Sequence, residues 1–516
     1  MSDAADRGIT VTEMAAMDQP IDVLRETTVA FVGRALRGPL NEPVLIGSFG
    51  EFRRRFGDIW SRSSLGPAVR QFFEHGGKRL YIVRVVNNAR GAMICLPASG
   101  SALVLRAVEP GSTELIRAAV DFDGIKANSD ELFNLTVQRI DPSSGLVIDQ
   151  ELFSGASSAE GSNNFVADML LTSSMVRVES PLPTHRPEET SGANVAFNIN
   201  YVEHTQEGTD GQELSDYDLV GSQKHQEGLF ALENIDQFDI LYLPPPGKHR
   251  DLGPTSILAA ERYCRSRGAM LIVDPLIDWE SPQAAVSGVR SQGLASPNLV
   301  SYFPRMLQRS EGDADARAAG GALAGLLCKL DRNHGAWSET NQQGLGFSRN
   351  LLPSVDVDAA QMQTLFRSGL NVIAKGPAGS ARLHGSVTMS RGSESHRQFS
   401  SLPVRRLCLQ VLKSIDEATR WAVFETENAR LADRIRAQLT AYLSCLADLG
   451  ALQDDHFIVE CDAGLRRRED GADHGFAIFV AFQPRACEEP VSFTLHQTVA
   501  GSRVASTAFA PGYQGQ

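Results

Sequence analysis

The feature that most constrains the fold is a strand–helix–strand unit in the middle of the chain. Residues 238–243 (FDILYL) form an apolar run that ends at three prolines, residues 256–267 have the pattern of a helix, and residues 269–274 (AMLIVD) form a second apolar run. Two strands joined through a helix lie parallel, with a right-handed crossover. The sequence therefore predicts a parallel strand pair within an α/β core.

Two other regions extend this core. Residues 27–33 (TTVAFVG) and 80–86 (LYIVRVV) are β-branched apolar runs typical of buried strands. Between them, residues 65–73 place Leu65, Val69, Phe72 and Phe73 on one helical face. Near the other end of the chain, further α/β elements are predicted, namely helices at 318–330, 404–421 and 431–449, and strands at 457–461 and 476–482.

The pattern changes between residues 92 and 200. Long helical periodicity disappears, and short strands are separated by turn-forming clusters, such as 141–145 (DPSSG) and 154–162 (SGASSAEGS). Regular short strands between such turns are typical of a β-sandwich or barrel. The predicted strands are 93–96, 103–108, 116–122, 135–140, 146–148 and 176–178.

Both ends of the chain carry an alternating segment without an obvious strand partner nearby. The first includes Ile9 and Val11, and the second, residues 492–499, includes Phe493, Leu495 and Val499. Alternation of apolar and polar residues indicates a strand. We interpret both segments as arms that pair with strands elsewhere.

Composition excludes several classes of protein. The 516 residues carry a net charge of −13, which argues against nucleic-acid binding, because a phosphate-binding surface is usually basic. Seven dispersed cysteines without a CxxC pair predict free thiols and no zinc site. The N-terminus lacks a secretory signal pattern, and no apolar run reaches about 18 residues. We expect a cytoplasmic protein without direct membrane insertion.

Candidate catalytic and cofactor sites are weak. The run from Gly376 to Ser380 lacks the G-K-[ST] ending of a phosphate loop, so a turn between strands is the better interpretation. Asp274 ends a parallel strand, where α/β enzymes keep catalytic acids, but Asp274–Pro275 equally ends a strand by turn chemistry. His75, His334, His384 and His496 have no ligand-spaced neighbours. We predict no catalytic, metal or cofactor residues, and keep an α/β enzyme with a site near Asp274 as the alternative.

Seven stretches, in order, resemble one family, the contractile tail sheath proteins of phages, R-type pyocins and extracellular injection systems. They are 27–57 (TTVAFVGRALRGPLNEPVLIGSFGEFRRRFG), 68–85 (AVRQFFEHGGKRLYIVRV), 208–246 (GTDGQELSDYDLV onward to PPP), 269–276 (AMLIVDPL), 331–337 (DRNHGAW), 365–390 (LFRSGLNVIAKGPAGSARLHGSVTMS) and 405–452 (RRLCLQ onward to LGAL). The stretch LHGSVT at 383–388 departs from the family, which often has a tryptophan and an Arg-Thr pair there. Residues 92–200 carry little resemblance, as expected of a variable insertion.

The resemblance implies a mixed α/β discontinuous core with a β-rich inserted domain and extended terminal strand arms. The implied divisions are an N-terminal arm (1–26), a first core segment (27–91), a β-rich surface insertion (92–219), a second core segment (220–489) and a C-terminal arm (490–516). The C-terminal half of the second core segment would lie near the inner tube.

The implied function is structural. Stacked hexameric rings of the subunit would surround an inner tube and contract, with strand arms joining subunits by β-augmentation. The implied partners are the protein itself, the inner tube protein, baseplate and terminal cap proteins and other sheath paralogues. Assembly would take place in the cytoplasm, and the product would be a virion tail or a tail-like particle.

The helix predicted near residues 428–449 matches the element of the family that faces the inner tube. Its apolar stripe is Leu431, Ile435, Leu439, Tyr442, Leu443 and Leu446, and Arg430, Arg434 and Arg436 lie off that stripe. A solvated basic face is the simplest interpretation of the three arginines. The resemblance adds a second one, in which they pair with carboxylates of the tube.

Overall fold

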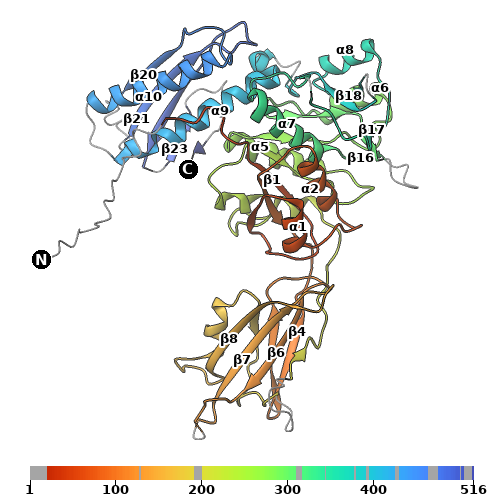
Figure 1. Ribbon diagram of the computed structural model, residues 1–516, viewed down its shortest axis with the longest axis vertical. Coiled ribbons are helices and arrows are strands. Elements are labelled where there is room, and N and C mark those ends of the chain that lie inside the picture. The colour runs from red at the N-terminus through yellow and green to blue at the C-terminus, as the bar shows by residue number, and fades with distance from the viewer. Residues whose placement is uncertain are drawn as a thin grey trace, which may run out of the picture.

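A six-stranded sheet forms the centre of the protein (Figure 1). The strand order is β13–β12–β11–β1–β3–β2, and all strands are parallel except β2. The bounds are β1 Val29–Gly33, β2 Pro43–Ile46, β3 Leu80–Arg84, β11 Ile240–Tyr242, β12 Met270–Ile272 and β13 Leu299–Val300. The predicted parallel pair is therefore confirmed as β11 and β12, which α5 (Pro254–Ser266) connects.

The computed structural model describes most of the chain. The described residues are 20–126, 129–190, 200–308, 316–342, 344–376, 379–390, 394–424, 429–462, 475–499, 501–504 and 514–515. Ile9 and Val11 lie outside them.

Helices cover both faces of the central sheet, so its strands are buried on both sides. In β1, Phe31 packs into one apolar cluster, whereas Ala30 and Val32 pack into another on the opposite face. This arrangement explains why the strand has no polar residue, as is usual for parallel sheets. The helices of the first face are α1 Phe49–Phe56, α2 Leu65–Glu74 and α7 Gly320–His334. Those of the second are α4 Asp216–Val220, α5, α6 Pro282–Gln292 and α8 Ala359–Arg367, with the 3-10 helix Gly228–Asn234.

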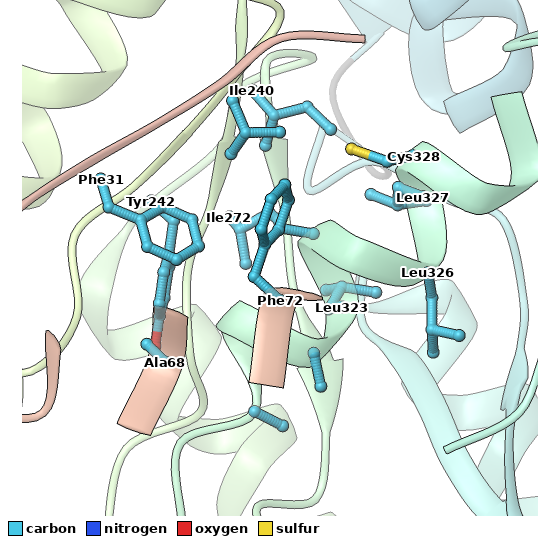
Figure 2. Close-up of a cluster of buried hydrophobic side chains, with 14 of the residues drawn as sticks. Phe31, Ala68, Phe72, Ile240, Tyr242, Ile272, Leu323, Leu326, Leu327 and Cys328 are labelled. Carbon is cyan, nitrogen blue, oxygen red and sulfur yellow. The ribbon is translucent and has the colours of Figure 1, made fainter. Parts of the chain in front are cut away.

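Helix α7 approaches α2 closely, and glycine makes this approach possible. A Cβ on Gly321 would lie 2.3 Å from the carbonyl oxygen of Ala68, and one on Gly325 would lie 2.4 Å from that of Phe72. Figure 2 shows Phe72 between the side chains of the sheet and those of α7. The small residues of α7 thus allow two helix backbones to touch above the sheet.

Two small sheets flank the core after β13. One has the order β14–β18–β19, and the other β16–β15–β17. Their bounds are β14 Tyr302–Phe303, β15 Met306–Gln308, β16 Ala316–Arg317, β17 Leu351–Pro353, β18 Asn371–Lys375 and β19 Ala381–His384.

A β-rich domain projects from the core (Figure 1). It contains a sheet ordered β10–β6–β7–β8 and a second ordered β4–β5–β9, packed around their own apolar cluster. The bounds are β4 Met93–Ala98, β5 Ser101–Ala107, β6 Leu115–Asp121, β7 Leu132–Ile140, β8 Val147–Ser157, β9 Val176–Glu179 and β10 Val202–Glu203, with the short helix α3 Val166–Met169. The turn predicted at 154–162 is wrong for its first residues, because β8 continues through Ser157 in a bulged pairing with β7.

The chain leaves the core for this domain and returns from it side by side near Arg90 and Thr209, a place here called the neck. Two arginines of the core make contacts there. The Arg84 side chain is buried and donates to the carbonyl oxygens of Gly38 (2.7 Å) and Pro110. Arg34 donates to the carbonyl oxygens of Asp210 (2.6 Å) and Gly211 (3.1 Å). The β5–β6 loop of the domain and the returning chain at Asp210 and Gly211 are therefore bonded to the core through main-chain carbonyl groups.

The C-terminal region forms a separate layer of two helices and a sheet (Figure 1). Helices α9 Leu402–Thr419 and α10 Ala429–Asp448 pack with a five-stranded sheet ordered β20–β21–β22–β23–β24. The strand bounds are β20 Ile458–Asp462, β21 Gly475–Phe482, β22 Val491–Thr498, β23 Gly501–Val504 and β24 Gln514–Gly515.

Candidate assembly surfaces

The segment that leads into β1 is fixed to the body by two carboxylates. Asp239, just before β11, forms an ion pair with Arg25 and accepts a hydrogen bond from the Thr28 amide (3.0 Å). Asp331 of α7 accepts a hydrogen bond from the Thr27 hydroxyl. Asp331 is 6% exposed, and Arg25 and Asp239 are 20% and 22% exposed, so water reaches these contacts poorly and they are costly to break. The segment is also held further upstream, because the Gln410 side chain of α9 donates to the Val23 carbonyl (2.7 Å) and Val23 packs against the C-terminal core.

Asp239 also binds Lys413 of α9, whose side chain is only 2% exposed. The Lys413 ammonium lies 3.2 Å from the carboxylate and also donates to the Phe238 carbonyl. Burial opposes ionisation of Asp239, but Arg25 and Lys413 outweigh it and hold its pKa well below the usual range. Burial lowers the pKa of Lys413 to about 8, despite the attraction of Asp239. The site is thus a charged cluster of one carboxylate between two cations.

Helix α9 uses four buried charged side chains to join the core to the C-terminal layer. Besides Lys413, Arg406 pairs with Asp331 and Arg405 donates to the Asn298 side chain (2.8 Å). On the C-terminal side, Asp416 accepts from Gln497 of β22 (3.0 Å). A shift of α9 would leave these buried charges without their partners, and an uncompensated buried charge costs about 3–5 kcal/mol.

The second predicted arm is paired within the chain. Strand β22 pairs with β21 on one side and β23 on the other, so the prediction that residues 492–499 lack a local partner is wrong. Phe493 and Leu495 are buried in the C-terminal core, whereas Val499 is 62% exposed. The alternating pattern arises because one face of the sheet packs on α9 and α10. Whether Phe493, Leu495 and Val499 act between subunits stays a prediction.

Helix α10 presents its basic residues outward. The predicted apolar stripe from Leu431 to Leu446 is buried, and Arg430, Arg434 and Arg436 are exposed. Arg436 pairs with Asp433 (2.7 Å), and the Arg434 guanidinium lies 6.0 Å from the Trp421 ring centre. Arg430 is in the first turn, where a cation interacts unfavourably with the helix dipole. The position of Arg430 is therefore not explained by the stability of the helix.

Asp274 has a structural role in the fold. Its carboxylate accepts from the Tyr242 hydroxyl (2.7 Å) and from the amides of Ala319 (3.1 Å) and Gly320 (3.0 Å) at the start of α7. Burial raises its pKa, partly offset by Arg305. These contacts satisfy the free amides of a helix N-terminus. Capping α7 is therefore a structural reason for a buried carboxylate at position 274, where the alternative interpretation placed an enzyme site.

The glycine-rich run at 376–380 and His75 have local structural roles. The Gly376 amide donates to the Ser380 carbonyl (2.8 Å) between the antiparallel strands β18 and β19, which confirms the predicted turn. His75 is buried, with Nδ1 bonded to the Gln71 carbonyl (2.7 Å). Across the described ranges, no three His, Cys, Asp or Glu side chains are grouped to hold a metal, and no helix is long and apolar enough to cross a membrane.

Solved structures of other proteins have a similar fold over most of this chain. The sheath tail protein Lin1278 of Listeria innocua superposes with a TM-score of 0.61, covering 94% of this chain and 97% of that one at 13% identity. The chain has the fold of tail sheath proteins. The sheath tail protein of Desulfitobacterium hafniense (TM-score 0.54, 14% identity, 95% and 100% covered) and the contracted helical sheath of the anti-feeding prophage (0.52, 15%, 94% and 97%) are also similar.

Sequence comparison agrees over a shorter region. The tail sheath protein of Vibrio phage KVP40 is 26% identical over 147 residues, which is 28% of this chain. The match spans about a fifth (21%) of that relative's length. No family model matches the chain.

The structure also identifies residues of the tail sheath fold that the sequence patterns did not. Arg25, Asp239 and Lys413 are far apart in the chain, and none belongs to a recognisable motif. The available signal was a lysine at position 413, within the apolar face of a predicted helix. A cation in such a position calls for a buried anion, but the sequence does not tell which one.

Proposed function

We propose that this chain is the structural subunit of a contractile sheath, which polymerises as stacked hexameric rings around an inner tube and contracts to drive the tube through a target envelope. The observation that carries the proposal is the similarity to sheath proteins over 94% of the chain, which includes the projecting domain and the C-terminal layer. The charged contacts of α9 support it, because they suit a body that moves as one piece.

Strand arms between subunits fit this function. Strand β20 lies at one edge of the C-terminal sheet, so its outer main-chain groups are available to a further strand. In the proposed assembly, the alternating segment with Ile9 and Val11 pairs with such an edge on another copy. Phe493 and Leu495 then belong to the receiving sheet. The anchored segment from Arg25 to Thr28 transmits tension from the arm to the body.

The inner tube is the proposed partner of α10. Arg430, Arg434 and Arg436 project from one exposed helix and fit carboxylates on the tube surface, where rim charges set registry more than affinity. The variant Arg430→Glu/Arg434→Glu is expected to assemble about tenfold less sheath on purified tubes. Arg262→Glu/Arg290→Glu, on the exposed faces of α5 and α6, is the charge-matched control. Equal assembly of both variants would contradict the tube contact.

The remaining proposed partners are the baseplate and terminal cap proteins, and other sheath paralogues where they exist. In this proposal the subunits assemble in the cytoplasm and end in a virion tail or tail-like particle. Electron microscopy of the purified protein with its tube protein is the deciding experiment. Striated tubes are the expected result, and a subunit that never polymerises with or without tubes would refute the function.

A further inference from the structure

Charge is divided unevenly between the projecting domain and the adjoining region of the core. Residues 92–209 contain sixteen acidic and six basic residues, a net charge of −10 within a chain of −13. Residues 27–91 contain eleven basic and four acidic residues, a net charge of +7. One molecule therefore carries two regions of opposite sign, each large enough to steer association.

Five exposed carboxylates lie at the end of the projecting domain farthest from the core, here called the acidic tip. It is formed by the β6–β7 loop and the segment 186–190, which are held together because Arg186 donates to the carbonyl oxygens of Ser129 and Leu132 and the Thr190 amide donates to that of Val120. Its exposed carboxylates are Asp123, Asp130, Glu131, Glu188 and Glu189.

The tip is acidic because its five exposed carboxylates outnumber its two cations, Lys126 of the β6–β7 loop and Arg186. Arg186 lies 3.9 Å from Asp130 and 3.9 Å from the ring centre of Phe122. Arg106 pairs with Glu179, and Arg139 pairs with Glu114 (2.7 Å). These arginines serve contacts inside the domain. The carboxylates of Glu131, Glu188 and Glu189 form no ion pair with any residue that the structure describes.

The basic residues gather where α1 ends, beside the neck. This basic shoulder consists of Arg37, Arg53, Arg54, Arg55 and Arg62. The Arg37 side chain donates to the Arg54 carbonyl (3.1 Å), so the two residues are neighbours. Arg53 pairs with Asp58 and Arg55 with Glu51, at more than half exposure of both arginines. Arg54 and Arg62 are exposed and have no ion pair among the described residues.

The acidic tip and the basic shoulder of one molecule cannot meet. Strand β6 begins close to the neck, where Gly38 donates to Glu109 (2.9 Å), and it runs for seven residues before it ends at the tip. At about 3.3 Å per residue, this strand alone puts about 20 Å between them. Figure 1 shows the domain extending away from α1 over its whole length. The two surfaces are thus available only to other molecules.

We infer that the acidic tip of one copy of this chain binds the basic shoulder of a second copy. Such a contact joins two different surfaces head to tail, and repeats of it build rings or helices. It therefore rests on the proposed function and names an additional contact within that assembly. Exposed charges of this kind mainly raise the association rate and select the register, and their effect falls with salt.

A charge-swap experiment tests the contact. The shoulder variant is Arg54→Glu/Arg62→Glu, and the tip variant is Glu131→Lys/Glu188→Lys. Each is expected to slow polymerisation of the full-length chain on purified tubes about tenfold at low salt, followed by light scattering and electron microscopy. Mixing the two variants is expected to restore mixed polymers, because each supplies the surface that the other lacks. For the wild type, the rate is expected to fall as salt rises from about 0.05 to 0.5 M.

The controls separate this inference from folding and from the proposed function. All four positions are exposed, so unchanged thermal unfolding is expected of each variant. Arg262→Glu/Arg290→Glu and Asp278→Lys/Glu280→Lys change the net charge equally elsewhere on the surface and are expected to polymerise normally. If the wild type polymerises but the swapped variants match these controls, the contact is refuted while the sheath function stands. If the wild type does not polymerise at all, the sheath function fails first.

Discussion

The substitution Asp239→Asn tests the charged cluster that anchors the segment before β1. It keeps the shape of the side chain but leaves Lys413 without its anion and Arg25 with Glu417 alone, at 3.9 Å. A carboxyl whose pKa falls from about 3.9 to about 2 contributes about 2.6 kcal/mol at neutral pH, and the two cations hold the pKa of Asp239 well below its usual range. Breaking a buried pair costs about 3–5 kcal/mol in general. We therefore expect a loss of about 3 kcal/mol in the free energy of unfolding.

The measurement is urea unfolding of the full-length subunit at pH 7. The double variant Asp239→Asn/Lys413→Met removes the orphaned ammonium as well, so it is expected to lose clearly less than the sum of the two single variants. Because the pKa of Asp239 is lowered in the folded state, its contribution is full above about pH 4 and is lost as the pH falls further. The gap between wild type and Asp239→Asn must therefore close in acid. A loss below about 1 kcal/mol, or a gap that is constant with pH, would refute the reasoning.

Three further outcomes are expected. Gly321→Ala should lower the free energy of unfolding by about 1–3 kcal/mol, since its Cβ would lie 2.3 Å from a backbone oxygen. Gly50→Ala in α1, where the nearest atom to the new Cβ is 3.8 Å away, should raise it by up to about 1 kcal/mol. If urea unfolding finds Gly321→Ala the more stable of the two, the packing argument is contradicted. Burial lowers the pKa of His75, so the unfolded chain takes up a proton at a higher pH than the folded one. Stability should therefore decline as the pH falls below about 6.5, and it should decline less in His75→Gln. Identical stability–pH profiles of the two proteins would exclude the effect. Asp274→Ala should cost about 1–2 kcal/mol by uncapping α7, and unchanged melting would refute the cap.

Local and periodic features of the fold were predictable from sequence. The parallel pair β11–β12 follows from strand–helix–strand spacing, and the buried face of α10 follows from the spacing of Leu431, Leu439 and Leu446. These signals are carried by neighbouring residues, so no knowledge of distant contacts is needed.

The pairing of strands and of distant charges was not predictable. The pairing of β22 is a local one that its pattern did not reveal: β21 ends at Phe482, β22 begins at Val491 and β23 begins at Gly501, but alternation alone does not show that both edges of a strand are occupied. The cluster around Asp239 joins Arg25 and Lys413, which lie 214 and 174 residues away in the chain. Patterns within a segment carry no information about which distant charge will neutralise a buried one.

The neck of the projecting domain has a consequence for protein engineering. Arg34 and Arg84 bind only main-chain carbonyl groups there, and the two crossings pair directly through Arg90 and Thr209. A main-chain oxygen is present whatever the side chain, so Arg34 does not select the side chains that it holds. Glycine is still required at Gly211, where a Cβ would lie 2.1 Å from the Asn87 carbonyl oxygen, and Arg84 needs a carbonyl in the place of that of Pro110, which lies inside the projecting domain. Foreign domains whose ends lie about 5 Å apart and that offer a carbonyl to the buried Arg84 are thus suitable grafts at this position, and a particle built from such chimaeras would display its cargo once per subunit.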